Sequence, residues 1–158
     1  MSWLPSLGPR GEGWVAIQFV LLAALVAAGL LGPAWDGAAR VTTSLVGLAF
    51  LVAGLTLAVR GLRDLRDALT PLPYPRDGAE LVETGVYARV RHPIYGGLIV
   101  AAFGWGALTA SPAALALAGV LFAFFQLKSG REEVWLVERF PGYPAYRERT
   151  RRLIPWIG

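Results

Sequence analysis

The sequence predicts an all-α integral membrane protein with about four transmembrane helices, a cytoplasmic connector and a C-terminal interfacial helix. Of its 158 residues, 55% are hydrophobic and only 16% are charged, whereas an average soluble domain is about 25% charged. Three stretches contain no charged side chain: residues 13–35, 41–59 and 93–127. Because about 20 apolar helical residues cross the hydrocarbon core of a bilayer, each stretch is long enough to span it.

These stretches divide into four predicted helices. The first ends at Gly32-Pro33, and its apolar part is longer than the core of a cleaved signal peptide, so we expect a retained helix. The third stretch is too long for one crossing and carries Ser111-Pro112 near its middle, which predicts two helices joined by a turn. One membrane domain is expected over 1–158. The predicted helices cover about 14–31, 41–59, 94–110 and 112–127.

A polar connector, residues 60–92, joins the second and third helices, and its proline-rich run 70–75 cannot be regular helix. Six of the fifteen basic residues lie in this connector, and seven follow the fourth helix. The positive-inside rule therefore places the connector and both termini in the cytoplasm, with the chain crossing the cytoplasmic (inner) membrane several times. Two segments on that face, about 81–97 and 128–155, are expected to build one site.

Composition excludes several classes of site. Cysteine is absent, which excludes disulfides and thiolate nucleophiles, and with a single histidine no zinc or haem site is expected. The net charge of +4 follows the membrane topology, so we do not interpret it as nucleic-acid binding. Arginine outnumbers lysine fourteen to one, and together with abundant alanine, glycine and proline this suggests a bacterial source.

The first candidate site segment is 85–97, where a dense polar cluster meets the start of an apolar helix. It holds the only histidine, and Pro93 suits the first turn of a helix. The N–H groups that begin such a helix favour a carboxylate or a phosphate. The alternative is that the arginines contact anionic lipid and the tyrosines belong to the aromatic belt. The cluster consists of Tyr87, Arg89, Arg91, His92 and Tyr95.

The second candidate is Arg131-Glu132-Glu133, which is expected just past the end of the fourth helix. Paired acids at a helix C-terminus oppose the helix dipole, so a cationic ligand or nearby arginines should compensate them. The alternative is a solvated helix end with weak local ion pairs. A third segment, 140–156, interleaves aromatic and basic residues and favours an interfacial anchor.

These residues resemble the isoprenylcysteine carboxyl methyltransferase family, which is similar to membrane phospholipid N-methyltransferases. The resemblance covers about 81–155 and rests on three features. They are the acid pair Glu132-Glu133, the aromatic spacing Phe140, Tyr143 and Tyr146 with the closing Ile154-Pro155, and the pattern G-x-Y-x-x-V-R-H-P-x-Y-x-G at Gly85, Tyr87, Val90, Arg91, His92, Pro93, Tyr95 and Gly97. The spacing before the tyrosines is one residue shorter than the family's usual pattern.

The resemblance implies S-adenosylmethionine as cofactor, bound between the cytoplasmic end of the third helix and the acid pair. The residues that it places around the cofactor are His92, Pro93, Tyr95, Gly97, Glu132 and Glu133. The chemistry of the ligand adds two more, because Arg91 suits its carboxylate and Tyr87 offers a flat surface to adenine or to the sulfonium cation.

The expected reaction is methyl transfer to a hydrophobic or amphiphilic acceptor, which is a carboxylate, an amine or a hydroxyl, at the cytoplasmic face. The acceptor is a small molecule or a lipid, the bilayer is the other partner, and neither nucleic acid nor metal is expected. One alternative is a nicotinamide-dependent membrane lipid reductase. A small four-helix transporter is less favoured, because the predicted helices contain no ionisable group. Candidates for orienting the acceptor are Arg89, Arg131 and Arg147.

Overall fold

The computed structural model describes residues 4–65, 68–70 and 72–154. Three residues used in the sequence predictions lie outside this part. They are Arg66 and Pro71 of the connector and Pro155 of the family pattern. The described elements are α1 (Glu12–Leu31), α2 (Ala39–Leu65), the short 3₁₀ helix η2 (Gly85–Ala88), α3 (Pro93–Leu108), α4 (Pro112–Arg139) and α5 (Tyr143–Arg149). Apart from one isolated β-bridge, the described residues form helices and loops, which confirms the all-α fold.

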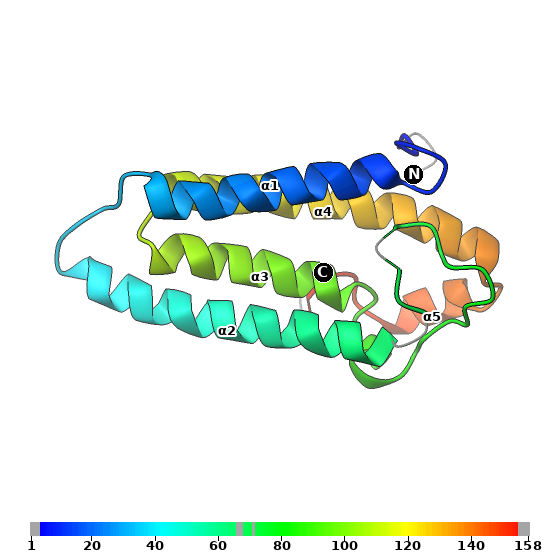
Figure 1. The fold of residues 1–158 in the computed structure, drawn as a ribbon. Helices are drawn as coiled ribbons and strands as arrows, with labels where there is room; N and C mark the ends of the chain where they lie inside the picture. The colour runs from blue at the N-terminus through cyan, green and yellow to red at the C-terminus, as the bar shows by residue number, and fades with distance from the viewer. Residues whose placement is uncertain (1–3, 66–67, 71, 155–158) are drawn as a thin grey trace.

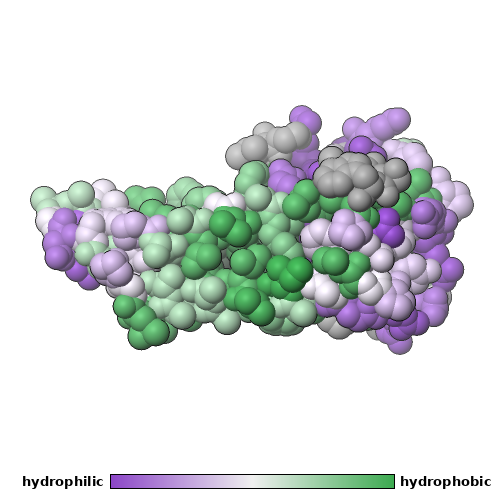
Figure 2. Space-filling view, turned by 90° about the horizontal axis from the view of Figure 1, so that it is seen from above, coloured by the Kyte–Doolittle hydropathy of each residue, from purple (hydrophilic) through white to green (hydrophobic). Residues whose placement is uncertain are grey.

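Three of these helices, α1, α2 and α4, are long and apolar enough to cross a membrane. The fourth predicted span is α3, whose 16 residues are apolar but fall short of that length. Hydrophobic residues cover the middle of the molecule, and hydrophilic residues lie at both ends, with the larger group at the end where Figure 1 places the connector and α5 (Figure 2). The polar segments that sequence predicts on one membrane face therefore do lie at one end of the bundle.

The helices pack in the order α2, α3, α4, α1, so that α1 and α2 lie on opposite sides of the inner pair (Figure 1). Glycines bring α2 and α3 together: a Cβ on Gly54 would overlap the backbone N of Ala101. A Cβ on Gly97 would lie only 2.5 Å from the carbonyl O of Gly54. Close helix contact of this kind is typical of small residues in membrane bundles.

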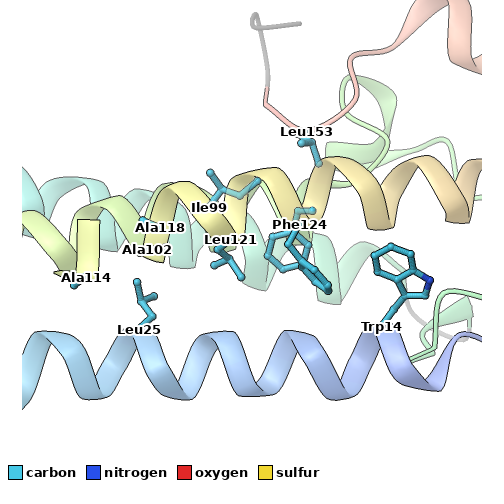
Figure 3. Close-up of a cluster of buried hydrophobic side chains, with 10 residues drawn as sticks. Trp14, Leu25, Ile99, Ala102, Ala114, Ala118, Leu121, Phe124 and Leu153 are labelled. Atoms are coloured by element: carbon cyan, nitrogen blue, oxygen red, sulfur yellow. The ribbon is translucent and has the colours of Figure 1, made fainter. Parts of the chain in front are cut away.

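A buried apolar cluster holds α1 against α3 and α4. Trp14 and Leu25 extend from α1 towards α4, where Leu121 and Phe124 meet them (Figure 3). The indole Nε1 of Trp105 also donates a hydrogen bond to the carbonyl O of Leu25, 3.2 Å away. This packing aligns the first turn of α3 with the polar end of α4.

The structure corrects the predicted end of the fourth helix. We expected it near residue 127, but α4 continues to Arg139, and α2 likewise extends to Leu65. The physical reason is that the sequence between Leu127 and Pro141 contains no proline to end the helix, and one glycine is tolerated. Arg131-Glu132-Glu133 therefore lies inside α4 and not past its end. The helix-dipole interpretation of the acids is wrong, because that effect falls off within the last turn.

Candidate active site

The two predicted site segments meet along a short backbone pairing. Val90 and Arg151 form a parallel bridge, in which the N–H of Arg91 donates to the carbonyl O of Arg151 at 2.8 Å. The N–H of His92 donates to the carbonyl O of Arg152 at 2.9 Å. The segment after α4, residues 140–154 and hereafter the tail, also passes close to α3, because a Cβ on Gly96 would overlap the carbonyl O of Leu153. The pairing fixes the tail against the start of α3.

Glu133 is buried and anchors this junction. Its carboxylate lies 2.9 Å from Arg91 Nε, and the ring Nε2 of His92 is 3.4 Å away. From the tail side, Arg152 Nε approaches to 3.4 Å and Arg147 Nε to 3.8 Å. Four basic side chains from two distant segments therefore share one buried carboxylate, which ties them into a single unit.

Arg91 strengthens the same junction. Its guanidinium donates to the carbonyl O of Arg147 at 3.0 Å and to the carbonyl O of Thr150. Arg91 thus donates hydrogen bonds to the Glu133 carboxylate and to two backbone carbonyls at once. The rigid fork of donors in arginine is suited to this use. We interpret Arg91 and Glu133 mainly as the residues that hold the tail in place.

Glu132 has different surroundings, although it is the next residue along the chain. Tyr95 donates its hydroxyl to the Glu132 carboxylate at 2.7 Å, and His92 Nδ1 lies 3.8 Å away. The ring of Tyr95 stacks on His92, with centroids 5.5 Å apart, and on Phe125 at 4.8 Å. The carboxylate side chain keeps 20% of its surface exposed. Glu132 is therefore oriented but still accessible.

A cavity of about 400 Å³ opens beside Glu132. Its walls come from α1, the end of α2, the connector, and the start of α3 with α4 and α5. Apolar lining residues include Val15, Phe19, Leu62, Leu65, Leu69, Leu72, Leu136 and Phe140. Polar lining residues include Gln18, Tyr87, Arg91, His92, Tyr95, Lys128, Glu132, Tyr143 and Tyr146. A cavity with both kinds of wall suits a ligand with a polar and an apolar part.

Three tyrosines at the polar side remain neutral hydroxyls. Burial raises the pKa of Tyr87, and the charge of Glu132 adds to this effect. Burial is also the largest cause of the raised pKa values of Tyr143 and Tyr146. Tyr146 donates its hydroxyl to the carbonyl O of Tyr87 at 2.7 Å. Among the described residues the buried hydroxyl of Tyr143 has no hydrogen-bond partner, and Tyr143 is one of the residues that line the cavity.

Several predicted residues lie away from this cavity. Arg89 is exposed, Arg131 stacks on the ring of Trp135 at 4.3 Å, and Arg147 lines a second groove on the other side of α4. None of these three candidates for orienting the acceptor is among the residues that line the cavity. Gly97 packs against α2, and buried Pro93 forms the first turn of α3.

Gln18 and Lys128 are among the polar residues of the cavity that sequence reasoning did not assign to the site. Each carried a signal. Lys128 is the only lysine in a chain with fourteen arginines, and Gln18 is the only polar side chain in α1 after the N-terminal Glu12. In the sequence both belong to a membrane helix or its end, and their direction cannot be assigned without the packing of α1 on α4.

Comparison with known proteins places the chain in a family. The profile of the phospholipid methyltransferase family matches residues 42–142, more than half of the chain. The nickel-cobalt-cadmium resistance protein NccN of Alcaligenes xylosoxydans xylosoxydans is 29% identical over 145 residues, which cover 89% of this chain and 62% of that protein.

A solved structure shows the same fold. The eukaryotic intramembrane Ras methyltransferase ICMT superposes with a TM-score of 0.67 at 21% identity, over 99% of this chain and 56% of that one. The chain thus spans about 60% of the length of the proteins that it matches. The family match agrees with the resemblance in the sequence and favours neither the reductase nor the transporter. This integral membrane protein belongs to the phospholipid methyltransferase family.

Proposed function

We propose that the protein is an S-adenosylmethionine-dependent methyltransferase that acts on a hydrophobic or amphiphilic acceptor at the membrane surface. The observation that carries this proposal is the cavity of about 400 Å³, which joins the Glu132–Tyr95–His92 cluster to an apolar wall. Residues 42–142, which match the methyltransferase family, include this cluster. Aligning two reactants in such a cavity can lower a barrier by about 7–11 kcal/mol at best, without a metal.

The polar side of the cavity fits the cofactor. S-adenosylmethionine supplies an activated methyl group on its sulfonium. The accessible carboxylate of Glu132 suits its ammonium group or its ribose hydroxyls. The hydroxyl of Tyr143, which has no partner among the described residues, offers a further hydrogen bond. The ring of Tyr87, which lines the cavity, offers a flat surface to adenine or to the sulfonium. His92 and Tyr95 hold the Glu132 carboxylate in position beside the cavity.

The apolar side of the cavity fits the acceptor. Val15 and Phe19 belong to α1, and Leu62 and Leu65 belong to the end of α2. Both helices also carry exposed apolar side chains along their length, which face lipid in a membrane. An amphiphilic acceptor can therefore keep its apolar part against these residues while its polar end reaches the cofactor. The carboxylate, amine and hydroxyl classes all satisfy this geometry.

The site is proposed to face the cytoplasm, with both termini on that side of the inner membrane. The basis is the concentration of basic residues in the connector and after α4, at the end of the bundle that holds the cavity. No group of acidic residues and histidine among the described residues could hold a metal ion. We propose the bilayer and an amphiphile as the partners.

Equilibrium binding of S-adenosylhomocysteine to the purified protein in a non-ionic detergent tests the proposal. Wild-type protein should bind it saturably, and His92→Ala and Glu132→Ala should each weaken binding. Asp36→Ala is the matched control, because this acid lies in the α1–α2 loop and pairs with Arg40. Folded protein without saturable binding, or binding that is unchanged in both site variants, would contradict the proposal.

A further inference from the structure

Lys128 is a buried cation on the acceptor side of the cavity. Only 2% of its surface is exposed, and it lines the cavity together with Gln18 of α1. Because it precedes Glu132 by four residues on the same helix, it lies on the same face, about 6 Å further towards the apolar half of α4. The lysine is thus about one helical turn from Glu132 along α4. It contacts α1 at Gln18, which lies between Val15 and Phe19 in the sequence.

Its contacts leave hydrogen-bonding capacity unused. The ammonium donates to the side-chain carbonyl of Gln18 and lies 4.9 Å from the ring centroid of Tyr95. An ammonium has three N–H donors, and Gln18 is the only hydrogen-bond acceptor it has among the described residues. Gln18 and Tyr95 thus orient the ammonium within the cavity wall and leave donors for a ligand.

No described carboxylate forms an ion pair with this ammonium. Glu132 attracts it over a longer range, but the Glu132 carboxylate already accepts the hydroxyl of Tyr95. A buried cation without a paired anion is unfavourable, and ionisable groups at such depth are typical of ligand sites. The chain has fourteen arginines and a single lysine, so the compact ammonium of a lysine side chain occurs only here.

We propose that Lys128, oriented by Gln18, binds an oxyanion of the acceptor, either a carboxylate or a phosphate. This inference rests on the proposed function and narrows it, because neutral and cationic amphiphiles should be poor ligands. The oxyanion replaces the missing partner of the ammonium, and the alkyl part of the acceptor lies against the apolar lining from α1. The simpler alternative is that Lys128 and Gln18 only tie α4 to α1.

The test is equilibrium binding of four matched probes to the full-length protein in phosphatidylcholine nanodiscs, with empty nanodiscs as background. The probes are hexadecanoate, hexadecyl phosphate, hexadecylamine and hexadecanol. Wild-type protein should prefer one or both anionic probes, and their order separates a carboxylate from a phosphate acceptor. Lys128→Met should weaken anion binding about tenfold to a hundredfold, the usual range for a hydrogen bond to a charged group. Lys128→Arg should retain part of the preference.

Arg63→Met is the control for loss of one positive charge, because Arg63 is an exposed residue of the last turn of α2. It should leave all four affinities unchanged. Gln18→Leu, which keeps the lysine, should lower anion binding to a smaller extent and serves if Lys128→Met does not fold. Equal binding of all four probes, or an equal loss of all four in Lys128→Met, overturns the inference.

Binding of S-adenosylhomocysteine in the same nanodiscs separates this inference from the proposed function. Retained binding of S-adenosylhomocysteine with no preference for anionic probes overturns only the role of Lys128. Wild-type protein that binds no S-adenosylhomocysteine overturns the proposed function itself.

Discussion

Glu132 and Glu133 are neighbours in sequence but occupy opposite environments. Glu133 points into the junction between α3 and the tail, where four basic side chains surround its buried carboxylate. Glu132 points into the cavity and keeps part of its carboxylate accessible. Successive residues of a helix differ by about 100° in direction, so one step along α4 moves a carboxylate from one environment to the other. Glu133 thus holds the fold together, whereas Glu132 is placed to bind a ligand.

The largest effect is expected for Glu133→Gln, which removes the charge that the junction shares. It leaves Arg91, His92 and two tail arginines without their common partner. Losing one partner of a buried ion pair typically lowers stability by about 3–5 kcal/mol. We expect a clearly lower melting temperature in detergent. A melting curve that matches the wild type would show that the network does not hold the tail.

Gly96→Ala tests the same junction without changing a charge. The added Cβ would overlap the carbonyl O of Leu153, so the tail or α3 must shift. Overpacking of this kind costs about 1–3 kcal/mol, which thermal unfolding can measure. Gly119→Ala on α4 is the control, since no atom of the described residues lies within 4 Å of its added Cβ. Equal stability of the two variants would contradict the close approach of the tail.

Glu132→Gln should show the converse behaviour. Because this carboxylate accepts only the hydroxyl of Tyr95 as a hydrogen bond among the described residues, its loss should change stability little. Binding of S-adenosylhomocysteine should weaken about tenfold or more, as expected for a lost charged hydrogen bond. Calorimetric binding and melting curves on one preparation measure both properties. If Glu132→Gln unfolded while Glu133→Gln bound S-adenosylhomocysteine tightly, the roles assigned to the two acids would be contradicted.

The smallest effects are expected for two tyrosines of α5. Tyr146→Phe removes the hydrogen bond to the carbonyl O of Tyr87 and should lower stability by about 1 kcal/mol. Tyr143→Phe removes a hydroxyl that has no partner among the described residues, so stability should not fall. Only Tyr143→Phe should reduce affinity for S-adenosylhomocysteine through lost direct contact. Thermal unfolding and binding titrations distinguish the two, and equal losses of stability would contradict the assignment.

Much of the architecture follows from the sequence, because charge-free stretches and the distribution of arginine determine the helices and their polar end. The meeting of segments 81–97 and 128–155 could be predicted in the same way, since both carry the charges of one membrane face. The end of α4 could not, because the fall in hydropathy after Leu127 does not show where the helix ends. The helix in fact continues to Arg139, two residues before Pro141.

The roles of individual side chains depended on information that one sequence does not contain. Arg89, Arg131 and Arg147 share the charge expected of a residue that orients an acceptor, yet their directions take them away from the cavity. Lys128 has the required direction because α1 packs on α4 and places Gln18 beside it. Helix phase and the path of the tail decide these roles, and both arise from tertiary packing.

An experimental structure with bound S-adenosylhomocysteine tests the central claim most directly. We predict that the ligand lies in the cavity of about 400 Å³, in contact with Glu132 and with its thioether on the side of Lys128. A second groove of about 830 Å³ lies between α4 and the tail and is lined by Glu133 and Arg147. Density for the ligand in that groove, with the Glu132 cavity empty, would contradict the account.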